Sequence, residues 1–409
     1  MTEALSPSPR STLHAPRSTA TPTPAAREDF PALAHVTHLN SGGMSPWPRP
    51  VIDELLRIPR QVGEYGPAPL LAHDEAFTRA EAAHRTVADF LGVAADEVAF
   101  TTQFSTGVSL VAEGLRWRPG DEIVVTDQEH PALLTPLLNV ARRRELVVRR
   151  FPVSPDPGAM LAALEGVLTA RTRLLAVSHV TTETGTRLPV AEMSRLARER
   201  GALVLYDGAQ SLGQFPIDVR ATGCDFYALV GYKWLFGPYP SAAVYIRREV
   251  LDQVEVTWTG SRVTTTAGID MDLDQLEFVE GARRFEYGGR VFAYDAAMAA
   301  GVEYVARAGP AAIERHAQRL TAYLHDAFAR VPGLEIRSTR DPRKATGIVT
   351  FSVEGADGAT LADALRERWN ILTRPALRGT SVRASIAAFT DEGDLDRLVE
   401  AVATVAAGR

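Results

Sequence analysis

The segments ALVLYDGAQ (202–210) and FYALVGYKWLFGP (226–238) decide the fold. Each begins with a run that is apolar on both faces, as expected of a strand in a mostly parallel sheet covered by helices on each side. The first run ends at Asp207, and the second is followed by Lys233. Ligands of open α/β sheets bind at the carboxyl ends of the strands, so the sequence predicts that Asp207 lies at a binding edge.

Five further β-rich runs continue this pattern along the chain, with helical stretches between them. Together with the first two, they predict an α/β fold whose large domain has a mostly parallel seven-stranded sheet. The five runs are EVAFTT (97–102), EIVVTD (122–127), ELVVRRFPV (145–153), RLLAVSHV (173–180) and SAAVYIR (241–247).

A smaller α+β region is expected toward the C-terminal end. A long amphipathic helical pattern covers 294–331, and Gly309-Pro310 interrupts it. Short β-rich runs follow, and a last helix is expected from Asp391.

Pattern and composition divide the chain into four parts. Residues 1–27 are rich in Pro, Ser and Thr and have almost no bulky apolar side chains, so we expect a disordered tail. A transit peptide is the alternative interpretation of this tail. Residues 28–60 are expected to pack with the small domain, 61–295 to form the large domain, and 296–409 to form the small C-terminal domain.

The overall composition excludes several classes of protein. The 409 residues carry a formal net charge of −6, so no global positive field attracts nucleic acid or anionic lipid. No apolar run approaches the roughly 18–20 residues of a membrane span, and no secretory signal is recognisable. We therefore expect a cytoplasmic protein without nucleic-acid or membrane partners. The single cysteine, Cys224, cannot form an internal disulfide, and no His/Cys spacing suggests a metal site.

Lysine is almost absent from the chain. Of the 44 basic residues, only Lys233 and Lys344 are lysines. Because arginine serves as the general cation in this chain, a lysine next to an apolar segment suggests a chemical role that arginine cannot perform. A buried lysine can lose its proton and act as an amine nucleophile, which arginine cannot do. The alternative is that Lys233 extends its ammonium group to solvent.

Lys233 and Asp207 together match the two protein groups that pyridoxal phosphate requires. An amine forms a Schiff base with the cofactor, and a carboxylate keeps the pyridinium nitrogen protonated, so that the ring accepts electrons from the substrate Cα. Taken alone, an Asp before a glycine, as at Asp207, is more often a turn former or a helix cap. The cofactor phosphate would be held in FTTQFSTGVSL (100–110), where a strand end meets the first amides of a helix. The Ser and Thr residues there are also ordinary helix caps.

Eight motifs carry a resemblance to a known family: LNSGGMSPWP, FTTQFSTG, QEHPALLTPL, SHVTTETGTRLPV, VLYDGAQSLG, GYKWLFGP, RFEYGGR and VRASIAAFTDEGDLDRLV. Their order resembles that of class V aminotransferase-fold proteins, in the branch of cysteine desulfurases, selenocysteine lyases and isopenicillin N epimerase. The resemblance spans roughly residues 35–405. It implies fold type I, pyridoxal 5'-phosphate as cofactor, an amino-acid substrate and a homodimer with its active sites at the subunit interface.

The resemblance assigns roles around the cofactor ring. It makes Lys233 the Schiff-base lysine, Asp207 the partner of the pyridinium nitrogen, and Gln210 a donor to the ring phenolate. Thr182 stands near the phenolate where an asparagine is usual. His130 falls where desulfurases place an imidazole that stacks on the ring, although a polar residue near a helix start is its alternative interpretation.

The resemblance also assigns the phosphate and substrate contacts. Tyr232 would hold the phosphate with the Ser105 hydroxyl and the Phe104 amide. Arg383 matches the arginine that binds the substrate α-carboxylate bidentately. Tyr65, in the GEYGP loop, is a candidate for a contact with the substrate.

Two departures from the desulfurase pattern bear on the reaction. Desulfurases carry a nucleophilic cysteine just before the VRAS arginine, whereas RPALRGTS (374–381) contains none. Cys224 is most simply a packing residue, so a persulfide on the protein is not expected. Gly289 replaces a threonine that reaches the neighbouring subunit's phosphate, and Arg290 is the candidate to take over that contact.

The predicted reaction is β-elimination of a sulfur or selenium leaving group from a cysteine-like substrate, because this chemistry needs no thiol relay. Epimerisation is the second alternative and requires an acid on the opposite face, for which Tyr65 and His130 are candidates. Transamination is the third. A noncatalytic protein of the same fold remains a fourth interpretation, against which the intact Asp207 and Lys233 pair argues.

Overall fold

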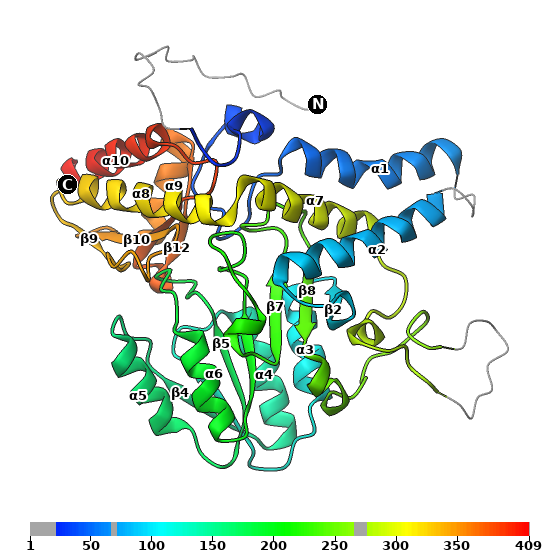
Figure 1. The fold of residues 1–409 in the computed structure, drawn as a ribbon. Coiled ribbons are helices and arrows are strands. Elements are labelled where there is room, and N and C mark those ends of the chain that lie inside the picture. The colour runs from blue at the N-terminus through cyan, green and yellow to red at the C-terminus, as the bar shows by residue number, and fades with distance from the viewer. Residues whose placement is uncertain (1–21, 67–71, 266–275, 409) are drawn as a thin grey trace, which may run out of the picture.

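The computed structural model describes residues 22–66, 72–265 and 276–408 (Figure 1). Its large sheet has seven strands in the order β2-β8-β7-β6-β5-β3-β4. Every neighbouring pair is parallel except the two that include β8, so the predicted mostly parallel seven-stranded sheet is confirmed. The strands are β2 (Val98–Thr101), β3 (Glu122–Thr126), β4 (Val147–Phe151), β5 (Thr172–Ser178), β6 (Leu203–Asp207), β7 (Phe226–Val230) and β8 (Ala242–Ile246).

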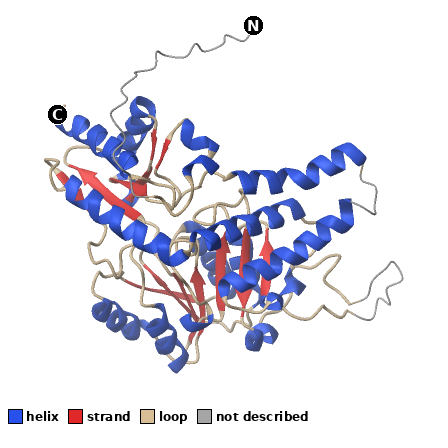
Figure 2. Cartoon of the chain, turned by 45° about the horizontal axis from the view of Figure 1, so that its top comes forward, coloured by secondary structure: helices blue, strands red, loops and turns tan. Residues whose placement is uncertain are grey.

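Helices cover both faces of this sheet (Figure 2). Leu205 of β6 belongs to the core on the side of α3 and α4, whereas Val204 and Tyr206 belong to the core on the side of α2, α5, α6 and α7. Because both faces are buried, β6 shows no alternation with charged residues before its last residue, Asp207. The helices are α2 (Ala72–Leu91), α3 (Phe104–Gly114), α4 (Pro131–Arg144), α5 (Pro157–Val167), α6 (Val190–Glu199) and α7 (Phe292–Ala308).

A four-stranded antiparallel sheet, in the order β12-β13-β10-β9, forms the centre of the C-terminal region. The predicted interruption at Gly309-Pro310 is confirmed, because α7 ends at Ala308 and α8 begins at Pro310. The elements of this region are α8 (Pro310–Phe328), β9 (Leu334–Ile336), β10 (Ile348–Val353), α9 (Gly358–Trp369), β11 (Ile371–Leu372), β12 (Arg374–Ala376), β13 (Ser381–Ser385) and α10 (Glu392–Ala407).

The N-terminal segment contacts both regions. Strand β1 (Thr37–His38) pairs with β11 of the small domain, and helix α1 (Arg49–Tyr65) packs along α7. Helix α7 also packs along α2 of the large domain (Figure 1). The boundary expected between 295 and 296 therefore falls inside a helix that both regions share.

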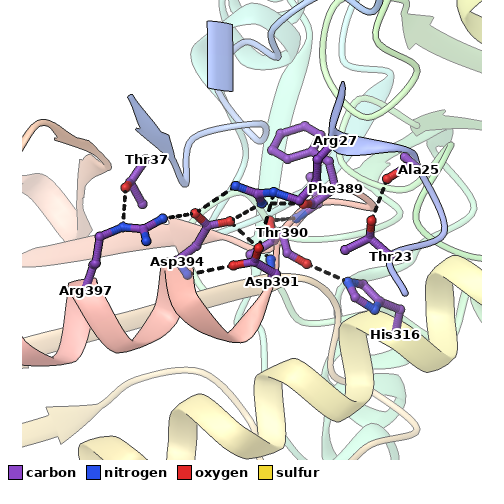
Figure 3. A network of polar contacts seen from close by, with 11 residues as sticks. Thr23, Ala25, Arg27, Thr37, His316, Phe389, Thr390, Asp391, Asp394 and Arg397 are labelled. Atoms are coloured by element: carbon purple, nitrogen blue, oxygen red, sulfur yellow. Dashed lines mark hydrogen bonds and ion pairs between the residues drawn. The ribbon is translucent and has the colours of Figure 1, made fainter. Parts of the chain in front are cut away.

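The expected disordered tail divides into two parts. Residues 1–21 lie outside the described residues. Residues 22–27 differ from the expectation, because Ala25 is buried and Arg27 forms an ion pair with Asp394 at 2.5 Å (Figure 3). Local composition could not predict this packing, since its partners lie more than 350 positions away in the sequence.

Within the described part of the chain, no helix is both long and apolar enough to cross a membrane. In the same residues, no group of three His, Cys, Asp or Glu side chains is arranged to hold a metal ion.

Candidate active site

Asp207 is the last residue of β6 and is buried at the carboxyl edge of the large sheet. Its Oδ1 accepts a hydrogen bond from the Ala209 amide at 2.8 Å, and Ser178 is its neighbour on β5. Burial raises the pKa of Asp207 to about 6, although the charge of Lys233 acts in the opposite direction. The carboxylate therefore lies at the edge where α/β sheets bind ligands.

Lys233 lies in the turn after β7, and its side chain is almost fully buried. Burial lowers the pKa of its ammonium group to about 8, and the positive charges of Arg383 and Arg374 lower it further. The Asp207 carboxylate raises it. An amine with this pKa loses its proton much more readily than a surface lysine, as a nucleophile or general base requires.

Arg383, in the centre of β13, is 1% exposed. Its Nη1 donates to the Thr182 carbonyl at 2.9 Å, but Nε and Nη2 have no hydrogen-bond partner among the described residues. Burial lowers its pKa to about 9. Unsatisfied N–H groups on a buried guanidinium are costly. The Nε and Nη2 pair matches the two oxygens of a carboxylate, so this site fits the α-carboxylate of an amino acid.

The N-terminal segment lies directly beside Arg383. A Cβ at Gly42 would lie 3.2 Å from Arg383 Nη2 and 2.9 Å from Ser385 Oγ, so only glycine fits there without displacement. Further buried oxygens around this point also have no partner among the described residues. They are Asn40 Oδ1, Ser41 Oγ, Ser45 Oγ and Ser385 Oγ. The motif LNSGGMSPWP contains no predicted site residue, because nothing in its local sequence indicates that it lies beside β13.

Gln210 connects the N-terminal segment to the loop that carries Lys233. Its Nε2 donates to the Gly42 carbonyl at 2.8 Å, and its Oε1 accepts from Trp234 Nε1 at 2.9 Å. One N–H of the Gln210 amide remains for another acceptor. Thr182, whose carbonyl accepts the hydrogen bond from Arg383 Nη1, is also buried.

His130 caps the start of α4, with its Nδ1 accepting from the Ala132 amide at 3.1 Å. Burial lowers its pKa to about 4, and the charges of Lys233, Arg374 and Arg383 act in the same direction. The imidazole is therefore neutral near pH 7.

Glu129 is a member of the site that the sequence analysis missed. It accepts hydrogen bonds from the Ser178 amide at 3.0 Å, the Ser178 hydroxyl at 2.6 Å and the Thr126 hydroxyl at 2.5 Å. Burial raises its pKa to about 7, and the charge of Asp207 contributes. Glu129 thus joins the ends of β3 and β5 next to His130. Its only sequence signal is its place in the QEHP motif.

A hollow at the N-terminus of α3 could take a phosphate. Ser105, in the first turn, donates to the Ala132 carbonyl at 2.9 Å. Tyr232 is half-buried against the Tyr239 ring, and burial raises its pKa to about 12, so its hydroxyl remains a donor. Free amides at a helix start favour an anion. The hollow, of about 370 Å³, is lined by Thr102, Gln103, Ser105, Thr106, Trp258 and Tyr287 among others.

Two predicted residues are not brought into this group within the chain. Tyr65 ends α1 with its side chain 72% exposed, and α1 leads away from the sheet (Figure 1). The guanidinium of Arg290 forms ion pairs with Glu286 and Asp295. Arg290 is therefore already paired, which argues against its predicted role as a replacement phosphate contact.

Cys224 lies at the opposite edge of the large sheet. It precedes β7 by two residues, whereas Ala228, the register partner of Asp207, lies four positions further along. At about 3.3 Å per residue, Cys224 is roughly 13 Å from the level of Asp207. Burial raises the pKa of the thiol to about 12, and its Sγ lies 3.8 Å from the Val219 carbonyl oxygen. The thiol is neither near the site nor ionised.

Arg374 is a second cation of the site that sequence reasoning did not single out. It stands directly opposite Arg383 in the register of β12 and β13. Its charge acts on Lys233, His130 and Tyr232. In a chain with 44 basic residues, of which two are lysines, composition gives no signal for one particular arginine.

Comparison with known proteins gives a consistent result. The family model "Aminotransferase class-V" matches residues 38–398. A probable cysteine desulfurase of Methanothermobacter thermautotrophicus is 30% identical over 397 residues, which cover 93% of this chain and 97% of that protein. A cysteine desulfurase of Serratia proteamaculans is 31% identical over 407 residues, covering 92% and 97%.

Solved structures are similar over nearly the whole chain. A C-DES mutant with glycine covalently linked to its PLP cofactor superposes with a TM-score of 0.86 at 28% identity, covering 94% of this chain and 99% of that one. A complex of the cystine C–S lyase C-DES with its reaction product, cysteine persulfide, has a TM-score of 0.84 at 28% identity, covering 91% and 99%.

Proposed function

The chain belongs to the class V aminotransferase family, and on this premise we propose that it is a C–S lyase that cleaves the Cβ–S bond of a cysteine-derived amino acid. The family, fold type I and the pyridoxal-phosphate cofactor predicted from the sequence are confirmed by the family match and by the PLP-bound neighbour. The observation that carries the proposal is the buried Arg383, whose Nε and Nη2 have no partner among the described residues and whose charge acts on the buried amine of Lys233.

The described residues fit pyridoxal phosphate. When bound, the cofactor supplies an electron sink for the charge that develops at the substrate Cα. Lys233 would provide the attaching amine, and the Asp207 carboxylate would hold a proton at the pyridine nitrogen. The neutral imidazole of His130 would pack on the ring, and Gln210, with its spare N–H, and Thr182 would face the phenolate.

The hydroxyl-rich start of α3 suits the cofactor phosphate. The Phe104 amide and the Ser105 hydroxyl belong to the first turn of this helix, where backbone N–H groups have no partner within the helix. The protonated hydroxyl of Tyr232 adds a further donor. The Phe104 amide and the Tyr232 hydroxyl would supply hydrogen bonds to an anion without a full positive charge. The Ser105 hydroxyl would join them by turning away from the Ala132 carbonyl, to which it donates here.

Substrate orientation and proton removal follow from two side chains. Arg383 binds the α-carboxylate through Nε and Nη2, which fixes the position of Cα. The Lys233 amine then removes the Cα proton, because its lowered pKa makes the free base accessible near neutral pH. Loss of the sulfur group from Cβ and addition of water give pyruvate, ammonium and the sulfur-bearing leaving group.

The proposed reaction uses no protein thiol. The segment 374–381 contains no cysteine, and the thiol of Cys224 is buried at the far edge of the sheet. The similarity to the cystine C–S lyase C-DES supports this view. Epimerisation is less well supported, since it needs a second proton donor. Tyr65 is exposed at the end of α1, and a His130 with a pKa of about 4 carries no acidic proton at neutral pH.

Arg374 indicates the class of substrate. Like charges directly opposite each other on two strands are destabilising, and Arg374 and Arg383 occupy such positions. One carboxylate satisfies Arg383, which leaves Arg374 for a second. We therefore propose a substrate with a carboxylate on each side of the Cβ–S bond that is cleaved, as in cystine.

We further propose that the active protein is a homodimer. Three large apolar side chains are exposed near the α3 hollow: Tyr239 at 50%, Trp258 at 60% and Val291 at 63%. A second subunit would cover them. Sedimentation of the holoprotein tests this, with a mass of twice 44.3 kDa expected and a monomer contradicting it. The cytoplasmic location stays a prediction.

Product analysis tests the proposed reaction. The yellow holoprotein is incubated with cystine, cysteine and a panel of other amino acids. Pyruvate, inverted stereochemistry at Cα and transfer of the amino group to a keto acid are measured separately. We expect pyruvate from cystine, in step with release of a persulfide-bearing small molecule. Inversion or amino transfer without pyruvate would contradict the proposal.

A further inference from the structure

Residues 23–36, which we call the N-terminal strap, are bound to the small domain (Figure 3). Arg27 Nη1 donates to the Phe389 carbonyl at 2.7 Å and to Asp394 Oδ2 at 2.5 Å, and its Nε lies 3.2 Å from Asp391 Oδ2. The Ala25 amide donates to the Ala388 carbonyl at 3.2 Å. The strap is thus fixed to the loop after β13 and to the start of α10.

Phe30 is the buried centre of an aromatic cluster that joins three parts of the chain. Its ring lies 4.8 Å from the Phe389 ring, 5.2 Å from that of Phe236 and 5.6 Å from that of Tyr304, measured between centroids. The Phe236 and Phe389 rings also contact each other, at 5.8 Å. Removing the Phe30 ring would therefore leave Phe236 and Phe389 with a cavity between the elements that carry them.

Phe236 belongs to the loop that carries Lys233. It lies three residues after the lysine, its amide donates to the Lys233 carbonyl at 3.2 Å, and its φ is +59°. A bulky side chain in this left-handed region is disfavoured, so the conformation persists only when the surroundings impose it. The cluster around Phe30 supplies that constraint.

Phe389 lies in the loop that follows the strand carrying Arg383. It lies four residues after the end of β13, in the loop to which Arg27 is bound. Phe30 is therefore in simultaneous contact with the lysine loop and with the loop of the carboxylate-binding strand. These two loops come from different regions of the chain, more than 140 positions apart in the sequence.

We propose that Phe30 is a positioning residue, which holds the Lys233 loop in register with Arg383 so that a substrate bound through its carboxylate presents Cα to the amine. Arg27 locks the strap that carries Phe30 onto the small domain. The kinetic part of this inference rests on the proposed lyase function, whereas its structural part does not.

The test uses the full-length holoprotein with Phe30→Ala and the conservative Phe30→Leu. Phe328→Ala is the matched control, because Phe328 is fully buried against Phe351, at 4.6 Å between centroids, in the core of the small domain. Two quantities are measured: amide hydrogen exchange of peptides covering 231–237 and 386–390, and kcat per cofactor that borohydride fixes to the chain. Counting cofactor-bearing sites removes any effect of misfolded protein.

For Phe30→Ala, we expect faster exchange in both peptides and a fall in kcat per site of about tenfold to a hundredfold, as a misplacement near 1 Å produces. Phe30→Leu should restore most of both. Phe328→Ala should lower the melting temperature and leave kcat and both peptides near wild type. If Phe30→Ala does not fold, Arg27→Gln takes its place, with Arg319→Gln, which breaks the neighbouring ion pair to Glu392, as its control.

Unchanged exchange in 231–237 in a folded Phe30→Ala protein would overturn the inference. An equal change caused by Phe328→Ala would overturn it as well. If no amino acid is turned over by the wild-type protein, the proposed function fails, and the exchange measurement alone decides on Phe30.

Discussion

Lys233 is the residue on which the chemistry depends, and its identity is testable because the chain has one other lysine. The side chain of Lys344 contacts residues outside the candidate site. Its Nζ donates to the Pro155 carbonyl at 2.5 Å and lies 3.5 Å from Asp341 Oδ2. We expect Lys233→Ala to abolish turnover and borohydride fixation of the cofactor, since arginine cannot replace the amine. Lys344→Ala should retain both. Equal fixation of cofactor in the Lys233→Ala protein, measured by mass spectrometry, would contradict this assignment.

The lowered pKa of Lys233 also predicts a pH dependence of stability in the apoprotein. Its folded pKa, about 8, lies below the ordinary value of 10.5, so folding disfavours the charged form. The cost to the free energy of unfolding is fully present below pH 8 and disappears as the pH rises to about 10.5. Each pKa unit of the shift corresponds to about 1.4 kcal/mol, so the total cost is roughly 3 kcal/mol. Lys233→Met should abolish this rise in unfolding free energy between pH 8 and 10.5. Denaturant titrations of both apoproteins measure it, and parallel curves would refute the shift.

Strands β12 and β13 place Arg374 directly opposite Arg383, and the two positive charges repel each other. Arg374→Gln should leave the fold unchanged or stabilise it by about 0.2–1 kcal/mol, because a like-charge pair is removed. It should raise KM for cystine about tenfold to a hundredfold, since a charge-assisted contact of about 1.5–3 kcal/mol is lost. KM for β-chloroalanine, whose leaving group carries no carboxylate, should change little.

Arg378→Gln is the control for this prediction, because Arg378 is exposed in the turn between β12 and β13. An equal rise in KM for cystine and for β-chloroalanine in the Arg374→Gln protein would mean that Arg374 does not contact a second carboxylate. Equal effects of Arg374→Gln and Arg378→Gln would mean that only the general positive field matters.

The elements show what sequence reasoning can reach. The strands and the break at Gly309-Pro310 were predictable because their signals are local: apolar runs, and a proline that cannot continue a helix. The packing of Arg27 and the pairing of Arg374 with Arg383 were not. They depend on strand register and on contacts between distant segments, which leave no trace in local composition.

At the scale of the whole molecule, the large sheet separates the site from the one thiol. Asp207, Lys233 and the motif residues could be proposed individually from the sequence, whereas Glu129 and Arg374 could not, and the incomplete hydrogen bonding of Arg383 became visible only in three dimensions. The N-terminal segment, the large domain and the small domain each contribute to it: Gly42 borders Arg383, and Gln210 joins Gly42 to Trp234. The candidate site therefore forms only where the N-terminal segment, the large domain and the small domain pack together.

The most direct measurement of the central claim is pyruvate formation from cystine by the Cys224→Ala holoprotein, with mass spectrometry of the chain after turnover. The account predicts kcat near wild type and no added sulfur on the protein, because elimination proceeds through Lys233 without a thiol relay. Loss of a buried sulfur can cost about 1 kcal/mol of stability, so folding and cofactor content are verified first. A folded, yellow Cys224→Ala protein that forms no pyruvate, while wild type does so and carries a persulfide on Cys224, would contradict the account.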